Sequence, residues 1–178
     1  MRIAEFVADL RQHDDAGARA LELVILTAAR TNEVVQARWR EFDRKDRLWT
    51  IPAERMKGKR EHKVPLSDAA MAILAKQDAI RSNDFVFPGS YGAKHVGANL
   101  LGQALKRLGH GDLTMHGFRS TFTDWAAETT EFLWEVREMA LAHKIRNEVE
   151  ADYRRGDLFD KRRQLIAAWA SYISGGRS

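Results

Sequence analysis

The stretch ALELVILTAARTNEVVQARW, residues 20–39, contains an apolar run followed by a polar junction. Leu21 and Ile25 fall on one face at helical spacing, together with Ala28 or Ala29. This periodicity predicts that residues 16–29 form a buried helix.

The polar junction that follows is predicted to start a second helix. Thr31 or Asn32 provides a side-chain oxygen that can cap the free N–H groups of a helix start. Glu33 falls in the first turn, where a carboxylate interacts favourably with the positive end of the helix dipole. Arg30 is therefore predicted to lie between two helices and not in the middle of one.

Between Arg47 and Leu66 the pattern changes from helical to β-favouring. Two short runs, LWTIP at residues 48–52 and HKVPL at residues 62–66, flank the turn-like sequence KGKR. We expect these runs to form a small antiparallel hairpin or sheet, with Lys57 near its tip.

Helical patterns resume after the hairpin, where Ser67 is expected to cap the next helix. Phe118, Phe122 and Trp125 recur at i, i+4 and i+7, which predicts an amphipathic helix with an aromatic core face. Further helices are predicted over Val96–Leu108 with Gly109 as its C-cap, over Phe132–Ala142, over a shorter segment that holds Tyr153, and over Leu158–Ile173.

These elements predict a mainly α fold with a small antiparallel β-sheet or hairpin, which is an α+β arrangement. No internal repeat and no low-complexity linker interrupts residues 1–178, so we expect a single domain. A chain of 178 residues is long enough to bury a core without disulfides or metals.

The composition excludes several classes of protein and site. Cysteine is absent, which rules out a disulfide framework and a thiolate zinc site and fits a reducing cytosol. The longest apolar run, Leu23 to Ala29 with Thr27 inside it, is far too short to span a bilayer. The 29 basic and 25 acidic residues leave a net charge of +4, which favours a polyanionic partner only mildly.

A set of cationic and nucleophilic side chains is scattered through this predicted fold. A phenol has a solution pKa of about 10, so a tyrosine reacts at neutral pH only where cations and a base surround it. Guanidiniums and imidazoles that meet on one phosphate would neutralise the charge that develops in phosphoryl transfer without a metal or another cofactor. The candidates are Arg30, Lys57, the HxxR pair His116 and Arg119, His143 and Tyr153.

Four blocks of the sequence resemble the catalytic domain of the tyrosine recombinases, the phage integrase family. The blocks are LTAARTNEVVQARWREFD at 26–43, WTIPAERMKGKREHKVPLS at 49–67, MHGFRSTFTDWAAE at 115–128 and LAHKIRNEVEADYRRGDLFDKRRQLIAAWASYI at 141–173. The resemblance covers nearly the whole chain from about Ala16 onward. It points to the integrases of prophages and genomic islands.

The resemblance implies that Tyr153 is the nucleophile of a site-specific DNA recombination reaction. This residue would attack the scissile DNA phosphate, form a 3′-phosphotyrosyl intermediate, and later be displaced by a 5′-hydroxyl without metal or ATP. Arg30 and Arg119 resemble the pair that holds the non-bridging phosphate oxygens, and Glu33 resembles the acid that supports the site.

The resemblance also implies the groups that move protons. Lys57 resembles the lysine that protonates the departing 5′-oxygen, although Lys59 is close enough in sequence to be an alternative. His116 resembles the histidine that accepts the tyrosine proton, and His143 resembles a second hydrogen-bond donor to the phosphate.

Partners and location follow from the same resemblance. The implied substrate is double-stranded DNA with attachment sites, bound by a tetramer of the full-length protein, with host bending or directionality factors as possible partners. The core-binding and arm-binding domains that precede this catalytic domain in full-length relatives are not part of residues 1–178. We expect a cytoplasmic, nucleoid-associated bacterial protein without a membrane partner.

Other interpretations of the same residues stay open. Tyr153 taken alone is better explained by packing, and Arg30 is near enough to Glu33 to form a structural salt bridge. The remaining histidines, His13, His62, His95 and His110, match nothing in the family pattern and are expected in solvent or turns.

Three alternatives concern the protein as a whole. The chain could be a type IB topoisomerase or a non-catalytic DNA-binding module of the same fold. The last predicted helix could pack on its own domain or on a neighbouring protomer.

Overall fold

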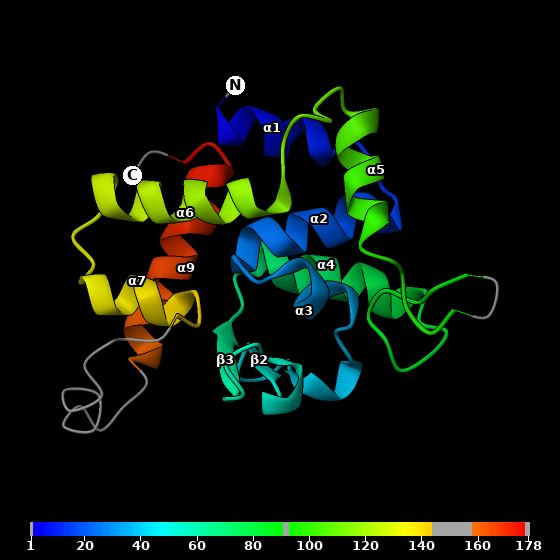
Figure 1. Cartoon of the computed structure of the whole chain (residues 1–178), viewed down its shortest axis with the longest axis horizontal. Helices are drawn as coiled ribbons and strands as arrows, with labels where there is room; N and C mark the ends of the chain where they lie inside the picture. Colours follow the sequence, from blue (N-terminus) through cyan, green and yellow to red (C-terminus); the bar gives the residue numbers. More distant parts are fainter. Residues whose placement is uncertain (1, 91–92, 144–157, 177–178) are drawn as a thin grey trace.

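The computed structural model describes residues 2–90, 93–143 and 158–176 (Figure 1). Its α-helices are α1 Ile3–Leu10, α2 Ala16–Thr27, α3 Thr31–Val35, α4 Asp68–Ala79, α5 Asn99–Arg107, α6 Met115–Thr129, α7 Trp134–Ala140 and α9 Phe159–Ile173. Two short 3-10 helices, η1 Trp39–Glu41 and η2 Ala53–Arg55, flank the strands β1 Phe42–Asp43 and β2 Leu48–Ile51, and β3 is His62–Pro65. The predicted mainly α fold with a small antiparallel sheet is confirmed.

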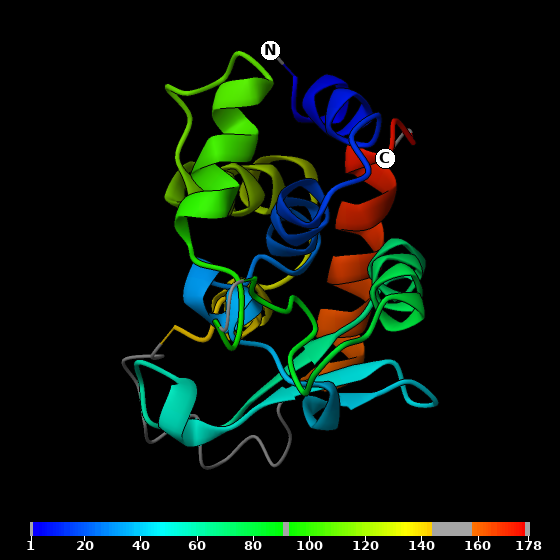
Figure 2. The same ribbon diagram turned by 90° about the vertical axis from the view of Figure 1, so that its right-hand side faces the viewer.

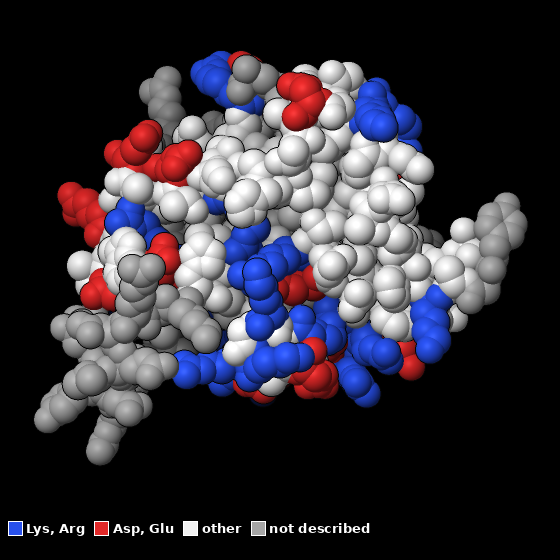
Figure 3. Space-filling view, in the orientation of Figure 1, with Lys and Arg blue, Asp and Glu red and all other residues white. Residues whose placement is uncertain are grey.

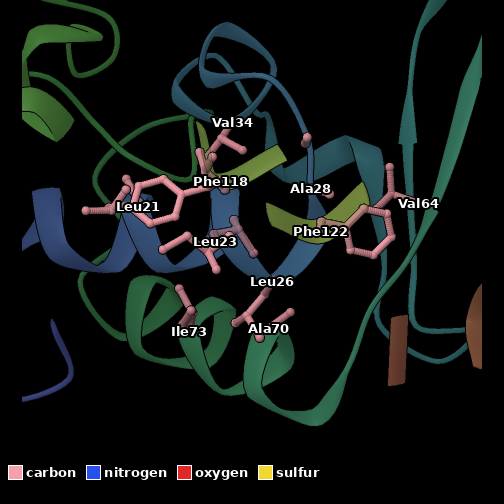
Figure 4. Packing of buried hydrophobic residues seen from close by; sticks show 14 of the residues in the cluster. Leu21, Leu23, Leu26, Ala28, Val34, Val64, Ala70, Ile73, Phe118 and Phe122 are labelled. Carbon is pink, nitrogen blue, oxygen red and sulfur yellow. The ribbon is translucent and has the colours of Figure 1, made fainter. Parts of the chain in front are cut away.

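Helix α2 lies at the centre of the molecule, between α4, α5, α6 and α9 (Figure 1). Its start is fixed by Asp15, whose carboxylate accepts hydrogen bonds from the backbone N–H groups of Gly17 and Ala18 at 2.8 and 3.1 Å. Residues from Gly17 to Thr27, except Arg19, are buried, and they pack against apolar side chains of α3, α4 and α6 (Figure 4). The buried helix predicted from residue 16 is confirmed, although it ends at Thr27.

The strands form an antiparallel sheet in the order β1-β2-β3 within the described residues. Trp49 pairs with Val64 and Ile51 pairs with His62, so the β2–β3 connection contains η2 and the KGKR turn. Figure 2 shows the sheet as a layer beneath the helices. The predicted hairpin is confirmed, with Lys57 in the loop that joins β2 to β3.

The aromatic face predicted for α6 is buried as expected. Phe122 and Trp125 pack on Trp169 of α9, with ring centroids 5.4 and 5.0 Å apart. Trp169 also donates its indole N–H to the carbonyl of Ile25 in α2, at 2.8 Å. The apolar face of α9 therefore packs on the core of its own chain.

Two helices are shorter than the sequence pattern predicts. The helix expected from Val96 begins at Asn99, because the N–H of Val96 is bonded to the carbonyl of Phe87 at 3.0 Å. The helix expected over Phe132–Ala142 spans Trp134–Ala140, and Ala142 has the positive φ of 52° that ends a helix.

None of the described helices is long and apolar enough to cross a membrane.

Candidate active site

Arg30 lies at the junction between α2 and α3, as predicted. Its backbone N–H donates to Glu33 Oε2 at 2.7 Å, and its Nη1 donates to Glu33 Oε1 at 2.9 Å. The Glu33 side chain is 5% exposed, whereas that of Arg30 is 33% exposed. The carboxylate thus caps α3 and orients the guanidinium while one side of Arg30 still faces solvent. The prediction that Thr31 or Asn32 caps this helix is wrong, because α3 begins at Thr31 and Arg30 occupies the N-cap position. The predicted Arg30–Glu33 salt bridge is present, and it leaves Arg30 accessible to an anion.

Arg119 comes from the second turn of α6 and is buried. Its Nη1 donates to the Ala28 carbonyl, and its Nη2 donates to the Leu141 carbonyl at 3.0 Å. These carbonyls belong to the C-cap residues of α2 and α7, where helix carbonyls lack internal donors and the helix dipole is negative. Two helix ends therefore hold the buried charge in place of a carboxylate.

The two arginines belong to one electrostatic unit. Burial and then the positive charge of Arg30 lower the pKa of Arg119 to about 10, and Glu33 opposes the change. At neutral pH Arg119 stays protonated, because its pKa is still well above 7. Two fixed guanidiniums near one carboxylate form an anion site, since arginine presents paired N–H donors to phosphate oxygens.

The lysine loop, which we define as residues 56–61, lies beside this unit. An open pocket of about 550 Å³ is lined by Arg30 and Glu33 on one side and by Arg55, Lys57 and Lys59 on the other. Both lysines are exposed. Arg30 and both lysines therefore line one pocket, and the catalytic role of Lys57 or Lys59 stays a prediction.

His116 is exposed on the first turn of α6. The turn is capped by Thr114, whose Oγ1 accepts from the Gly117 N–H at 3.0 Å. His116 and Arg119 are three residues apart and therefore occupy one side of the helix start.

His143 is exposed just beyond α7, two residues after the Leu141 carbonyl that holds Arg119. Its Nδ1 lies 3.0 Å from Glu138 Oε2, which fixes the orientation of the ring. The contact leaves Nε2 as the nitrogen that can meet a ligand.

Tyr153 and the helix predicted to hold it lie outside the described residues, as does Tyr91. Tyr172, the other tyrosine, stacks on Trp125 and Trp169 with centroid distances of 5.5 and 5.9 Å. Tyr172 is therefore a packing residue.

The prediction that His62 lies in solvent or a turn is wrong. His62 is a half-buried residue of β3, and its pKa is lowered to about 4 mainly by burial and then by Arg162. A hydrogen bond with the Ala140 carbonyl opposes this shift, whereas Arg119 and Arg30 add to it. The alternation of side chains along a strand could have predicted this burial, because His62 is two residues from buried Val64 and so lies on the same face of β3.

Within the described residues, no group of three or more His, Asp and Glu side chains is placed to hold a metal ion.

Lysine and arginine side chains gather at the centre and lower edge of the face shown in Figure 3, over the α2–α3 junction and the sheet. Acidic side chains lie mainly at the left, over the ends of α6 and α7. The arginine unit therefore lies where basic side chains gather on the face shown in Figure 3.

The likeness to a solved structure concerns the fold. The structure of the Tn1549 transposon integrase in complex with circular intermediate DNA superposes with a TM-score of 0.61 at 15% sequence identity. The match covers 92% of this chain and 61% of that chain.

Sequence comparisons identify closer relatives. The prophage integrase IntA of Escherichia coli K12 is 38% identical over 157 residues, which cover 86% of this chain and 38% of that protein. The integrase of enterobacteria phage P4 is 34% identical over 177 residues, covering 89% of this chain and 40% of the phage protein. The chain thus spans less than half the length of these relatives. The sequence model of the phage integrase family matches residues 2–157, and the chain belongs to that family.

Proposed function

We propose that this chain is the catalytic domain of a site-specific tyrosine recombinase that acts on double-stranded DNA. The observation that carries the proposal is the meeting of Arg30, Arg119 and Glu33 beside the pocket lined by the lysine loop. Two helix carbonyls hold the buried guanidinium of Arg119, and among the described residues it forms no direct ion pair with a carboxylate. Its charge is therefore available to a phosphate.

In the proposed reaction, Tyr153 Oη forms a bond to the scissile phosphorus while the bond from phosphorus to the 5′-oxygen breaks. Arg30 and Arg119 hold the non-bridging oxygens, whose negative charge increases in the transition state. His116 accepts the tyrosine proton, and Lys57 donates a proton to the 5′-oxygen.

The product is a 3′-phosphotyrosyl link that conserves the energy of the broken phosphodiester. A 5′-hydroxyl from another strand then attacks this link, releases Tyr153 and completes strand exchange without ATP. His143, whose ring is oriented by Glu138, carries a proton on each ring nitrogen and donates a hydrogen bond from Nε2 to the phosphate in both steps. No step uses a metal ion, because the arginines neutralise the phosphate.

The DNA partner agrees with the basic face in Figure 3 and with the DNA present in the Tn1549 integrase structure. Assembly into a tetramer on attachment sites, help from host bending or directionality factors, and a cytoplasmic location belong to the same proposal. Phosphate contacts would dominate the affinity and make it strongly dependent on salt.

The test captures the covalent intermediate. The chain is incubated in EDTA with a pool of end-labelled duplexes that carry a nick next to a randomised stretch, and protein-linked DNA is isolated and sequenced. We expect covalent complexes that Tyr153→Phe abolishes and that the matched control Tyr172→Phe leaves unchanged. Complexes that persist in Tyr153→Phe, or that require magnesium, would contradict the proposed mechanism.

A second step separates recombination from relaxation. An acceptor strand with a free 5′-hydroxyl, taken from a different duplex, is added to the isolated covalent complex. A joined strand of mixed origin is expected of a recombinase. Resealing only of the original strand would assign the chain to topoisomerase-like chemistry.

A further inference from the structure

A buried ion pair lies behind the lysine loop. The Glu41 carboxylate accepts hydrogen bonds from Trp49 Nε1 at 3.0 Å and from Arg55 Nη1, which lies 2.5 Å from both carboxylate oxygens. The side chains of Arg55 and Glu41 are 13% and 4% exposed. The pair is therefore largely removed from water and holds a single geometry.

The same guanidinium also reaches the arginine unit. Arg55 Nη2 donates to the backbone carbonyl of Glu33 in α3, and the Glu33 side chain holds Arg30. Arg55 thus joins three parts of the chain: the start of the sheet through Glu41, the helix that follows Arg30, and η2, which leads into the lysine loop.

The lysine loop extends into solvent. Residues 57–61 are exposed, and Met56 is the buried residue from which the loop projects. Lys57 is two residues from Arg55, so a shift of Arg55 moves the start of the loop directly. A general acid must be within hydrogen-bond reach of the leaving oxygen, and a misplacement of about 1 Å can lower a rate by about 100-fold.

We propose that Arg55 is a positioning residue, whose ion pair with Glu41 fixes the lysine loop against α3 so that the proton donor and Arg30 meet the same phosphate. This inference rests on the proposed function. A purely structural ion pair would stabilise the fold without favouring one step of the reaction. The two roles can be separated with two DNA substrates that differ in the leaving atom, because they predict different losses of cleavage rate on each.

The discriminating experiment changes the leaving atom. A nicked duplex whose sequence was recovered in the covalent-complex test is synthesised in two forms. One has oxygen and the other has sulphur at the 5′-bridging position of the scissile phosphate. An alkoxide needs the proton that the lysine donates, whereas a thiol ionises at a pKa of about 8.5 and leaves as the thiolate without a proton. The sulphur substrate is therefore insensitive to the position of the proton donor but still needs the nucleophile, the arginines and DNA binding.

Arg55→Met keeps most of the side-chain stem and removes the charge and the donors. We expect covalent-complex formation on the oxygen substrate to fall by about 30- to 100-fold and that on the sulphur substrate to fall by less than about 3-fold. Arg47→Met is the matched control, because Arg47 pairs with Asp68 on the surface, with side chains 50% and 86% exposed. This control should leave both rates unchanged.

A second variant tests the same proposal if circular dichroism shows that Arg55→Met does not fold. Glu41→Gln retains the shape of the side chain and an acceptor for Trp49, but it weakens the hold on Arg55. It should show the same selective loss on the oxygen substrate. In the background of Lys57→Ala, loss of Arg55 should add less than about 3-fold, because both changes remove the same step.

The outcomes are distinct. An equal loss on both substrates in folded Arg55→Met, or no loss on either, overturns the positioning role while the proposed function stands. A wild-type chain that forms no covalent complex with either substrate removes the proposed function, and this inference with it.

Discussion

Replacing His62 with glutamine should make the free energy of unfolding less sensitive to pH. The ring forms a hydrogen bond with the Ala140 carbonyl of α7, and it lies within electrostatic range of Arg162 of α9, Arg119 of α6 and Arg30 at the α2–α3 junction. Burial and then Arg162 lower its pKa to about 4, with smaller contributions from the other two arginines. In the unfolded chain the pKa of histidine is about 6.5.

The sign follows from proton uptake. As the pH falls below about 6.5, the unfolded chain binds a proton at His62 and the folded chain does not, so the folded state loses stability. This contribution is fully present above the unfolded pKa and is lost progressively as the pH falls towards the folded pKa of about 4. With these two pKa values the loss between about pH 7.5 and pH 5 is about 2 kcal/mol.

Urea unfolding followed by tryptophan fluorescence at the two pH values measures the difference. The glutamine side chain does not titrate, so the variant should lose about 2 kcal/mol less than the wild type on acidification. His13→Gln is the control, because His13 is exposed in the turn between α1 and α2 and should leave the pH dependence unchanged. Equal pH dependence of His62→Gln and wild type, within about 0.5 kcal/mol, would refute the reasoning.

Three further predictions concern the helix that carries the HxxR pair. Phe122→Ala removes a fully buried ring from its contact with Trp169 and should lower the free energy of unfolding by about 3–5 kcal/mol in urea titrations; a loss below about 1 kcal/mol would contradict this packing. Thr114→Ala removes the N-cap oxygen of α6 and should cost about 1 kcal/mol in the same titrations, whereas Thr114→Ser should cost almost nothing; equal losses would exclude the cap. Arg119→Lys keeps the charge but not the fork that binds two carbonyls, so covalent-complex formation should fall by about 100- to 1,000-fold, and a rate within about 5-fold of wild type would exclude the phosphate role.

The elements of the fold were largely predictable because local physical preferences determine them. Ser67 caps α4 through a hydrogen bond from the Ala70 N–H, as a serine before a helix should. The position of Arg30 at a helix junction and its contact with Glu33 follow from a spacing of three residues. The helix limits near Val96 and Phe132 were missed because contacts from other parts of the chain, such as the Phe87 carbonyl at Val96, compete with helical propensity.

The site itself depended on contacts between distant residues. Arg119 is held by carbonyls that are 91 and 22 residues away in sequence. Its environment could therefore be expected only from the family resemblance and not from any local pattern. The same is true of Arg55, which reads as one more surface cation in the sequence ERMKGKR but is buried against Glu41 and Glu33.

The sequence by itself thus determined most of the helices, the Ser67 cap, the hairpin and the family resemblance. Each of these follows from residues within a few positions of one another or from the pattern of whole blocks. Only the tertiary structure decided that three arginines lower the pKa of His62, that carbonyls at two helix ends hold Arg119, and that one ion pair joins the lysine loop to the arginine unit. The physical reason is that a side chain's charge and hydrogen bonds depend on which surfaces pack against it, and packing brings together residues whose separation in sequence carries no signal.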